Sequence, residues 1–494
     1  MTLSNVLTDK LKDPTLATDK SLVGNDWLAA SQSGKTFEVT NPATGEVIAV
    51  LPDVSKAEVT KAIDAAHTAQ KAWAKKTGKE RAAVLRKLND LMVANADDLA
   101  TILTMEMGKP WPEARGEILY GASYVEWFAE EAKRVYGDTI PGHQADKRIM
   151  VIKQPVGVVG AITPWNFPNA MLARKVAPAL AVGCAMVSKP AAQTPLSALA
   201  IALLAERAGL PAGLFSVLTS TDAAMVGQEL CANDKVRKLT FTGSTNVGRI
   251  LMRQGADQIM KLGLELGGNA PFIVFDDADL DAAVEGAMIS KYRNAGQTCV
   301  CANRLYVQSG IYDAFARKLA EKVGRLKVGN GFAEGVTTGP LIDSKAVEKV
   351  KEHVADAVSK GAQVALGGKP SAAGDLFFEP TILTGVTTAM KVATEETFGP
   401  VAPLFKFETE EEVIELANAT EFGLASYFYS KDIAKVFRVA EALEYGMVGV
   451  NTGLISTEVA PFGGIKQSGL GREGSKYGVD DYTEIKYICL GGIA

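Results

Sequence analysis

From about Met150 onward, short β-rich runs alternate with helical stretches, and this alternation restricts the fold more than any other feature of the chain. Helices are expected at Met171–Val182 and Leu196–Arg207. Alternation of this kind predicts an α/β domain with a mostly parallel sheet. The expected strands are Val156–Ile162, Ala185–Ser188, Phe215–Leu218, Lys238–Phe241 and Pro271–Phe275.

The remaining sequence predicts further structure on both sides of this domain. Residues 56–134 have apolar positions at three- and four-residue spacing, which predicts amphipathic helices, including Arg81–Met107 and Pro112–Val135. The section 305–455 alternates again and is long enough for a second α/β domain. Its expected strands include Leu305–Gln308, Gln363–Leu366 and Gly446–Val450. The tail Tyr482–Leu490 alternates as well and is expected to add an edge strand to another sheet or subunit.

Composition narrows the class of protein. A chain of 494 residues that is 47% apolar should form two or three domains. The net charge of −5 and the lack of a basic block predict neither nucleic acid nor a membrane surface as a partner. The N-terminal sequence shows no secretory signal, and no apolar run is long and unbroken enough for a membrane helix. Five cysteines and three scattered histidines lack metal-ligand spacing, so we expect no metal and a cytoplasmic, reducing environment.

Two segments carry candidates for covalent chemistry. Cys299 lies in the short polar stretch Arg293–Cys301, and Glu265 is a single carboxylate in the apolar, glycine-rich stretch Leu264–Asn269. A thiol to attack and a carboxylate to move a proton are the minimal pair for catalysis through a thioester. Taken singly, each residue could equally be a packing cysteine or a salt-bridged glutamate.

Two loops after expected strands could support such chemistry. Asn166 lies in a proline-bounded loop, where its amide could donate to an oxyanion, or where it could simply cap the next helix. The segment Phe241–Gly248 runs from a strand into a helix and could bind phosphate, although an ordinary glycine-rich turn is as good an interpretation. Lys189 ends a strand-like run and could be a solvated surface lysine.

Taken together, the motifs resemble the aldehyde dehydrogenase superfamily from about residue 25 to the end of the chain. The matching segments, in order, are PWNFP, FTGST, LELGGN, GQTC, EETFGPV and PFGGIKQSG. The resemblance implies a Rossmann-type cofactor-binding domain, an α/β catalytic domain and a small β oligomerisation unit. The cofactor-binding domain is expected at 1–133 and 154–263, the catalytic domain at 264–465, and the oligomerisation unit at 134–153 and 478–494, with 466–477 as a connecting segment.

The resemblance also implies roles for individual residues. Cys299 becomes the nucleophile, and Asn166 donates to the oxyanion together with the backbone N–H of Cys299. Glu265 becomes the base that activates the deacylating water, and Lys175 with Glu473 matches a proposed proton route. The residues implied to bind the cofactor are Trp165, Ser188, Lys189, Ala192, Gly243, Ser244, Glu396 and Phe398.

The expected cofactor is NADP, with NAD as a weaker alternative. Relatives that prefer NAD carry a glutamate three residues after the lysine, and here that position is Ala192. A carboxylate would repel a 2′-phosphate, whereas Ala192 beside Ser188 and Lys189 leaves room and a positive charge.

Within the superfamily, the segments around Arg174, Arg293 and Ser456 resemble most the enzymes that oxidise succinate semialdehyde to succinate. There the matching residues bind the far carboxylate of the substrate; surface salt bridges are the alternative for the two arginines. Glutarate semialdehyde is the nearest alternative substrate. A CoA-acylating dehydrogenase and a catalytically silent protein on the same fold are less favoured alternatives. We expect a homo-oligomer, either a dimer or a tetramer.

Cys301 raises the question of a redox switch. In an extended loop, residues two apart have Cα atoms ~6.6 Å apart, just inside disulfide reach, so oxidation could link Cys299 to Cys301. A small packing residue is an equally good interpretation of Cys301.

Overall fold

The first large sheet confirms the α/β organisation expected after Met150. The computed structural model describes residues 3–493 and contains an eight-stranded sheet in the order β2-β1-β9-β8-β7-β10-β11-β21. The five central strands are parallel and follow the order of a Rossmann-type sheet, in which a ligand binds at the carboxyl ends of the strands. Their bounds are β7 Val158–Ile162, β8 Ala185–Lys189, β9 Phe215–Val217, β10 Val236–Thr242 and β11 Lys261–Glu265, and the edge strand β21 is Gly469–Leu470.

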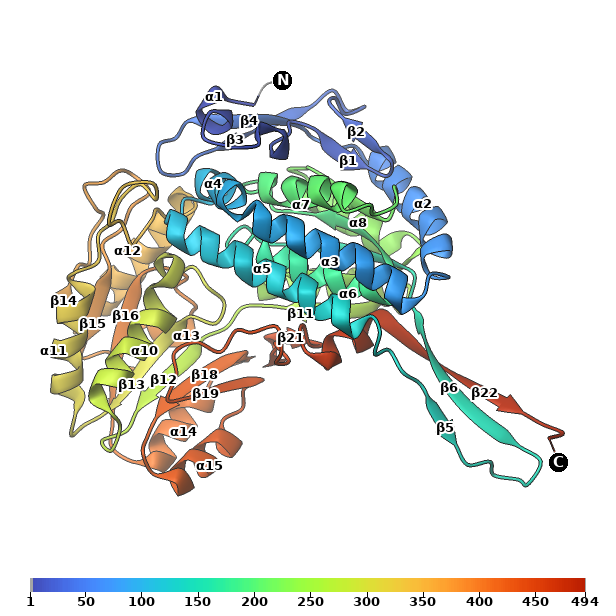
Figure 1. Ribbon diagram of the computed structural model, residues 1–494. Helices are drawn as coiled ribbons and strands as arrows, with labels where there is room; N and C mark the ends of the chain where they lie inside the picture. Colours follow the sequence, from blue (N-terminus) through green and yellow to red (C-terminus); the bar gives the residue numbers. More distant parts are fainter. Residues whose placement is uncertain (1–2, 494) are drawn as a thin grey trace.

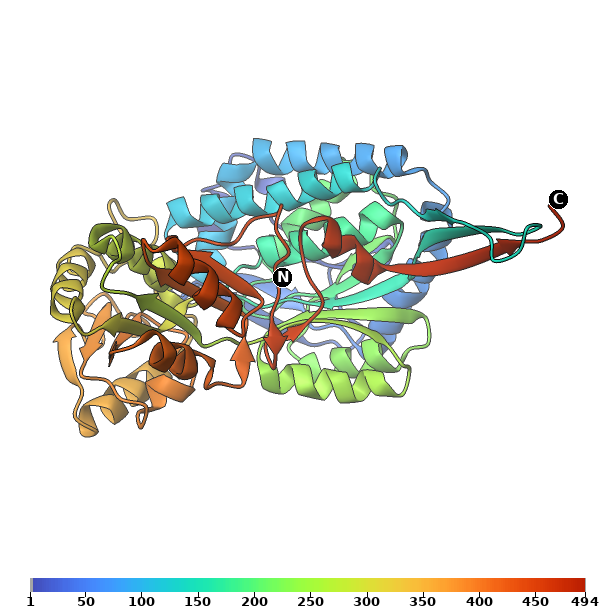
Figure 2. The same cartoon turned by 90° about the horizontal axis from the view of Figure 1, so that it is seen from below.

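Helices cover both faces of this sheet (Figures 1 and 2). On one side α6 packs on the strands and α3 and α5 pack on α6; on the other side lie α8 and α9. The helix α6 ends because Gly183 adopts a left-handed conformation, with φ of 104°. The helix bounds are α2 Lys56–Trp73, α3 Gly78–Ala94, α4 Ala96–Met107, α5 Trp111–Glu131, α6 Ala170–Val182, α7 Leu196–Arg207, α8 Ala223–Ala232 and α9 Thr245–Ala256.

The expectation of one helix over Arg81–Met107 is wrong, because the segment forms α3 and α4 with a break at Asn95. The side chain of Asn95 donates to the carbonyl of Leu91 at 2.8 Å, and its own backbone leaves the helical region. Asparagine competes in this way with helical hydrogen bonding, and here it ends one helix and begins the next. The helix expected from Pro112 to Val135 is α5, which begins at Trp111 and ends at Glu131.

The second large sheet has seven strands in the order β14-β15-β16-β13-β12-β18-β19, parallel except for β14. Along β12, Phe272 and Val274 pack on one face and Ile273 on the other, so both faces are buried, as parallel sheets require. The strand bounds are β12 Ala270–Val274, β13 Ala302–Gln308, β14 Gln363–Leu366, β15 Thr381–Thr384, β16 Val401–Phe407, β18 Ala425–Tyr429 and β19 Met447–Val450. The main helices are α10 Leu280–Tyr292, α11 Tyr312–Val323, α12 Ser344–Ser359, α14 Glu410–Asn418 and α15 Ile433–Ala442.

A third sheet projects away from the rest of the molecule (Figures 1 and 2). It consists of β22 (Thr483–Leu490), β6 (Arg148–Pro155) and β5 (Asp138–Ile140), all antiparallel. The strand expected at the tail is therefore confirmed. Short strands near the N-terminus were not predicted: β1 Ser21–Val23 and β2 Asp26–Leu28 extend the first sheet, and β3 Thr36–Thr40 pairs with β4 Val47–Pro52.

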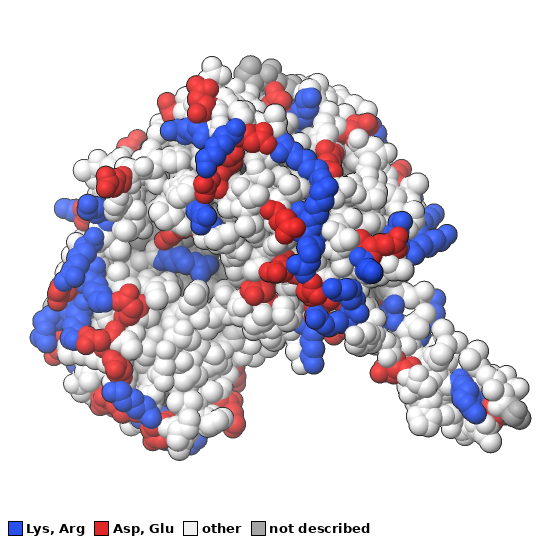
Figure 3. Space-filling view, in the orientation of Figure 1, with Lys and Arg blue, Asp and Glu red and all other residues white. Residues whose placement is uncertain are grey.

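The surface mixes charges of both signs. On the face drawn in Figure 3, lysine and arginine side chains are interspersed with aspartate and glutamate, and large uncharged areas lie between them. Among residues 3–493, no helix combines the length and apolar character that a bilayer crossing requires.

Candidate active site

A cleft of about 370 Å³ lies between the first and second sheets. The first sheet contributes the ends of β7, β10 and β11, and the second sheet contributes the loop of Cys299, the start of α12 and the loop of Glu396. The lining residues are Pro164, Trp165, Asn166, Met171, Thr242, Gly243, Ser244, Leu266, Gly267, Cys299, Ile342, Asp343, Lys345, Ala346, Lys349, Glu396, Thr397 and Phe398.

Three candidate residues are brought together by neighbouring parallel strands. Asn166 follows β7, Ser244 follows β10 as the N-cap of α9, and Glu265 is the last residue of β11. Because the carboxyl ends of parallel strands meet at one edge of a sheet, these three residues converge although they are far apart in sequence.

Cys299 reaches the cleft through an unusual loop. After α10, Asn294 and Ala295 both have φ of 53°, in the left-handed region that non-glycine residues rarely adopt. The buried side chain of Gln297 holds the loop by accepting the N–H of Ile342 at 3.0 Å. Burial raises the pKa of Cys299 to about 12, and the nearby charge of Arg174 offsets this only in part. The resting thiol is therefore protonated.

The amide of Asn166 is buried and fixed in the same cleft. Its Nδ2 donates to the carbonyl of Gln297 at 3.0 Å. An amide nitrogen has two hydrogens, so one remains to donate to an oxyanion. The hydrogen bond to the loop of Cys299 therefore orients the donor relative to the sulfur.

Glu265 is buried, with 3% of its surface exposed, and its Oε2 has no hydrogen-bond partner among the described residues. Burial and the carboxylate of Glu473 raise its pKa well above the ordinary value. Gly463 leaves room beside it, because a Cβ there would lie 3.0 Å from Oε1 of Glu265. A buried carboxyl with an unused oxygen is an acid–base candidate.

Arg174 and Lys175 on α6 both form ion pairs with Glu473, and all three side chains are buried. Burial opposes ionisation of Glu473, but the two cations outweigh it and lower its pKa. The guanidinium of Arg174 also lies 4.3 Å from the ring centre of Phe462. The structure therefore pairs Arg174 with Glu473, and Arg174 is not among the residues that line the cavity of Arg293 and Ser456.

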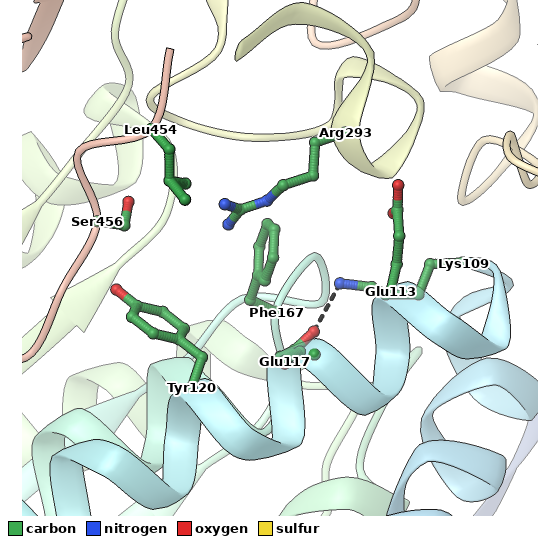
Figure 4. A pocket seen from close by; sticks show the side chains of 9 residues that line it. Lys109, Glu113, Glu117, Tyr120, Phe167, Arg293, Leu454 and Ser456 are labelled. Atoms are coloured by element: carbon green, nitrogen blue, oxygen red, sulfur yellow. Dashed lines mark hydrogen bonds and ion pairs between the residues drawn. The ribbon is translucent and has the colours of Figure 1, made fainter. Parts of the chain in front are cut away.

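A second cavity of about 290 Å³ contains Arg293 and Ser456 (Figure 4). The guanidinium of Arg293 points into it, 4.8 Å from the ring centre of Phe167. Within residues 3–493, Arg293 has no carboxylate at ion-pair distance and donates no hydrogen bond. A half-buried guanidinium without a partner suits an anionic ligand. The lining residues are Lys109, Glu113, Gly116, Glu117, Tyr120, Phe167, Arg293, Leu454 and Ser456.

The cofactor candidates lie at the cleft and beside it. Lys189 ends β8 and is 4% exposed; burial lowers its pKa to about 8. Ala192 lies in the turn that follows it. The hydroxyl of Ser188 donates to the carbonyl of Ser216 at 2.9 Å, within the sheet. This hydroxyl proton is therefore not available to a cofactor. Trp165 and Phe398 meet edge to face, with ring centres 5.6 Å apart.

The cleft fits a dinucleotide. The first turn of α9, capped by Ser244, leaves backbone N–H groups free to bind phosphate. Burial raises the pKa of Glu396 to about 7, and Gly267 leaves space beside it, since a Cβ there would lie 3.2 Å from Oε2 of Glu396. These residues could therefore hold a phosphate and the hydroxyls of a ribose.

Several residues of the two cavities were missed from the sequence. Lys349 on α12 donates to the carbonyl of Glu396 at 2.5 Å. Glu113, Glu117 and Tyr120 line the smaller cavity from one face of α5. Their spacing of four and three residues, in a helix that is otherwise apolar on that face, was the available signal.

The extended geometry expected around Cys301 is wrong. The N–H of Cys301 bonds the carbonyl of Thr298 at 3.0 Å, so residues 298–301 form a turn. Cys301 is 1% exposed, and its Sγ donates to the carbonyl of Lys291 at 3.3 Å. A disulfide to Cys299 stays a prediction, and forming it would cost Cys301 its hydrogen bond to the carbonyl of Lys291.

A Rossmann-type sheet facing a cleft that contains a thiol, an amide and a carboxyl defines a dinucleotide-dependent oxidoreductase. The chain belongs to the aldehyde dehydrogenase family, whose sequence profile matches residues 27–488. The resemblance drawn from the motifs is therefore confirmed.

Individual relatives match over nearly the whole chain. Glutarate-semialdehyde dehydrogenase of Pseudomonas aeruginosa is 66% identical over 484 residues, covering 98% of this chain and 100% of the relative. The NADP(+) succinate-semialdehyde dehydrogenase of Escherichia coli (strain K12) is 63% identical over 482 residues, covering 98% and 100%. The crystal structure of succinate-semialdehyde dehydrogenase from Burkholderia pseudomallei matches with a TM-score of 0.96 at 63% identity, covering 97% and 99%.

Proposed function

We propose that this protein oxidises succinate semialdehyde to succinate, with NADP as the preferred cofactor. The observation that carries the proposal is the unpartnered guanidinium of Arg293, which points into the cavity of about 290 Å³. Arg293 lies six residues before Cys299. An aldehyde whose far carboxylate binds Arg293 and the hydroxyl of Ser456 could present its carbonyl to the sulfur. The names of the relatives from Escherichia coli and Burkholderia pseudomallei support this substrate class.

The sulfur of Cys299 attacks the aldehyde carbon and forms a thiohemiacetal. Its oxyanion accepts hydrogen bonds from the amide of Asn166 and the backbone N–H of Cys299. Collapse of the oxyanion expels a hydride from the same carbon and leaves a thioester on Cys299. Bound NADP would supply the acceptor for that hydride and a positively charged ring that favours the thiolate. Because burial raises the pKa of Cys299 to about 12, this activation has to accompany binding.

Release of the product requires water and a base. In its deprotonated form, Glu265 takes a proton from the water that attacks the thioester carbon, and the carbon–sulfur bond then breaks to free succinate. Glu265 would pass its proton onward through the buried pair of Lys175 and Glu473. The unused oxygen of Glu265 and its raised pKa support this role.

The cofactor would lie along the cleft of about 370 Å³. Its phosphate would bind at Ser244 on α9, beside Gly243, and Glu396 would hold the ribose near the nicotinamide. Trp165 and Phe398 would contact the ring system. Ala192, Lys189 and Ser188 would face the adenosine ribose, where alanine leaves space for a 2′-phosphate.

The division into units is also a proposal. Residues 1–133 and 154–263 would bind the cofactor, 264–465 would form the catalytic domain, and 134–153 with 478–494 would join subunits of a dimer or tetramer. The projecting sheet β5-β6-β22 supports the last assignment. We also propose that the protein acts in the cytoplasm.

Arg174 is a further candidate for binding the carboxylate of the substrate. It could do so only if its ion pair with Glu473 opens.

Glutarate semialdehyde is a second candidate substrate. The relative from Pseudomonas aeruginosa, at 66% identity, is named glutarate-semialdehyde dehydrogenase. One methylene changes binding by only ~1–3 kcal/mol, so one pocket could accept both lengths.

The test is a kinetic panel of ω-carboxy aldehydes from three to six carbons, each with NADP and with NAD, on the wild type and Arg293→Ala. We expect the highest kcat/KM for the four-carbon aldehyde, and a rise in KM for it of ~10–100-fold in the variant, since a charge-assisted pair is worth ~1.5–3 kcal/mol. A neutral aldehyde of equal length serves as the control. Equal losses for both aldehydes would contradict the assignment of Arg293, and a higher value for the five-carbon aldehyde would favour glutarate semialdehyde.

A further inference from the structure

The helix α5 lies outside both sheets, yet two of its carboxylates reach into the candidate active site. Glu113 and Glu117 lie one helical turn apart on the face that lines the smaller cavity (Figure 4). Oε2 of Glu113 accepts the N–H of Asn294, in the loop that leads to Cys299, at 3.0 Å. Glu117 accepts N–H groups from the segment that follows Asn166. One helix therefore holds both of the loops that carry the reacting groups.

Lys109 and Glu117 form the centre of this contact. Their side chains are 1% exposed, and Lys109 Nζ lies 2.6 Å from Oε2 of Glu117. The same ammonium donates to the backbone carbonyl of Asn166 at 2.8 Å and lies 3.7 Å from the ring centre of Phe167. Each of its three hydrogens thus has a partner, and two of these partners belong to the loop of Asn166.

The other oxygen of Glu117 fixes the end of the same loop. Oε1 accepts the N–H groups of Asn169 and Ala170, at 3.0 and 3.2 Å, where α6 begins. The carbonyl of Asn166 also accepts from Nδ2 of Asn294 at 3.1 Å. Asn166 is therefore held from both sides, by Lys109 on one and by the loop of Cys299 on the other.

We propose that Lys109 and Glu117 are positioning residues, which set the location of the Asn166 amide relative to Cys299. Neither residue bonds the side-chain amide; Lys109 holds the backbone carbonyl of Asn166, and Glu117 holds the backbone three and four residues further on. The inference rests on the proposed function, because it assigns these residues to the oxyanion donor of that reaction. Small displacements of such a donor lower kcat, since the donor has to match the transition state.

The chain contains a matched control for this arrangement. Glu106 on α4 is also buried and accepts two successive N–H groups at the start of a helix, those of Leu196 and Ser197, at 2.7 and 2.8 Å. That helix, α7, carries none of the proposed catalytic residues. Glu106→Gln therefore removes a comparable buried carboxylate without touching the loop of Asn166.

The experiment compares Glu117→Gln with Glu106→Gln, using succinate semialdehyde and saturating NADP. We expect Glu117→Gln to lower kcat by ~10–100-fold with a much smaller change in KM, as a misplaced catalytic group does. Glu106→Gln should keep the wild-type kcat. If Glu117→Gln does not fold, the double variant Lys109→Met with Glu117→Gln takes its place. The double variant leaves no unpaired buried charge. Circular dichroism and the melting temperature establish folding.

A double-mutant cycle with Asn166→Ala separates positioning from a general structural effect. If Glu117 acts through Asn166, the Glu117→Gln change should have little further effect on kcat once the amide is absent. Equal fold-losses with and without Asn166 would overturn the proposal, and so would equal kcat values for the two glutamine variants. A wild-type protein that oxidises none of the aldehydes in the panel would instead refute the proposed function.

Discussion

At the scale of single residues, three of the groups proposed to act on the substrate or the cofactor sit in surroundings that oppose their ionisation. Cys299, Glu265 and Glu396 are each raised in pKa by burial. The same burial removes water, which strengthens every hydrogen bond and charge interaction around the reacting atoms. The protein therefore keeps its thiol and its acid protonated at rest and depends on bound ligands to activate them.

This arrangement predicts an alkaline pH profile. Cys299 and Glu265 act in their deprotonated forms, and both pKa values are raised, so the active fraction grows as pH increases. We expect kcat to rise from neutral pH into the alkaline range, without a plateau near pH 7. The measurement is kcat at saturating aldehyde and saturating NADP, because kcat includes the hydrolysis step of Glu265, and because Lys189, whose pKa is lowered to about 8, loses its charge in the same range.

The variant Glu265→Gln provides the control for that profile. It cannot titrate at position 265, so any remaining rise in the acylation step belongs to Cys299. A profile that is flat above neutral pH in the wild type would contradict the raised pKa values.

At the scale of elements, the regular periodic segments could be predicted from the sequence and the irregular ones could not. Leu196–Arg207 and Gln363–Leu366 have the same bounds in the structure as in the prediction, because each has a strong apolar pattern between turn residues. The break at Asn95 depends on one side-chain hydrogen bond, and the strands β1 and β2 have only three residues each, too few to show a period.

The candidate site divides in the same way. Cys299, Asn166 and Glu265 were singled out because their motifs occur together in the order of one family, whereas each motif alone left a packing or capping interpretation open. For Glu113 and Glu117 the spacing on α5 marks only a shared helix face, and it does not reveal what the two carboxylates contact. Their burial depends on loops about 50 and 180 residues further along the chain, which no local pattern reveals.

The projecting sheet gives a prediction about assembly. Along β22, Ile485 and Tyr487 point to the same face and are 73% and 59% exposed. Exposed apolar side chains on a long strand mark an interaction surface. We expect the double change Ile485→Lys with Tyr487→Lys to lower the molar mass of the protein in light scattering after size-exclusion chromatography.

A matched change on the opposite face of the same strand, Glu484→Lys, alters charge without removing apolar surface and should leave the mass unchanged. An unaltered mass in the double variant would show that β22 does not join subunits.

At the scale of the whole molecule, the cleft is built from both large sheets, so a cofactor bound there should stabilise them together. A ligand at about 100 times its Kd adds ~2.7 kcal/mol, which for a chain of this length corresponds to a rise in Tm of about 3 °C. We expect a larger rise with NADP than with NAD at equal concentrations, measured by differential scanning fluorimetry. Ala192→Glu should reverse the order, because its carboxylate repels a 2′-phosphate. A larger shift with NAD in the wild type would contradict the predicted preference.

The contacts that complete the site join positions far apart along the chain. Asn166 meets Gln297 across 131 positions, Glu113 meets Asn294 across 181, and Lys175 meets Glu473 across 298. Such long-range pairings form late in folding, because each must close a large loop. A polypeptide still emerging from the ribosome would thus carry the sulfur without the groups that direct it. The sulfur, the amide and the carboxyl therefore take up their shared arrangement only once the distant parts of the chain have come together.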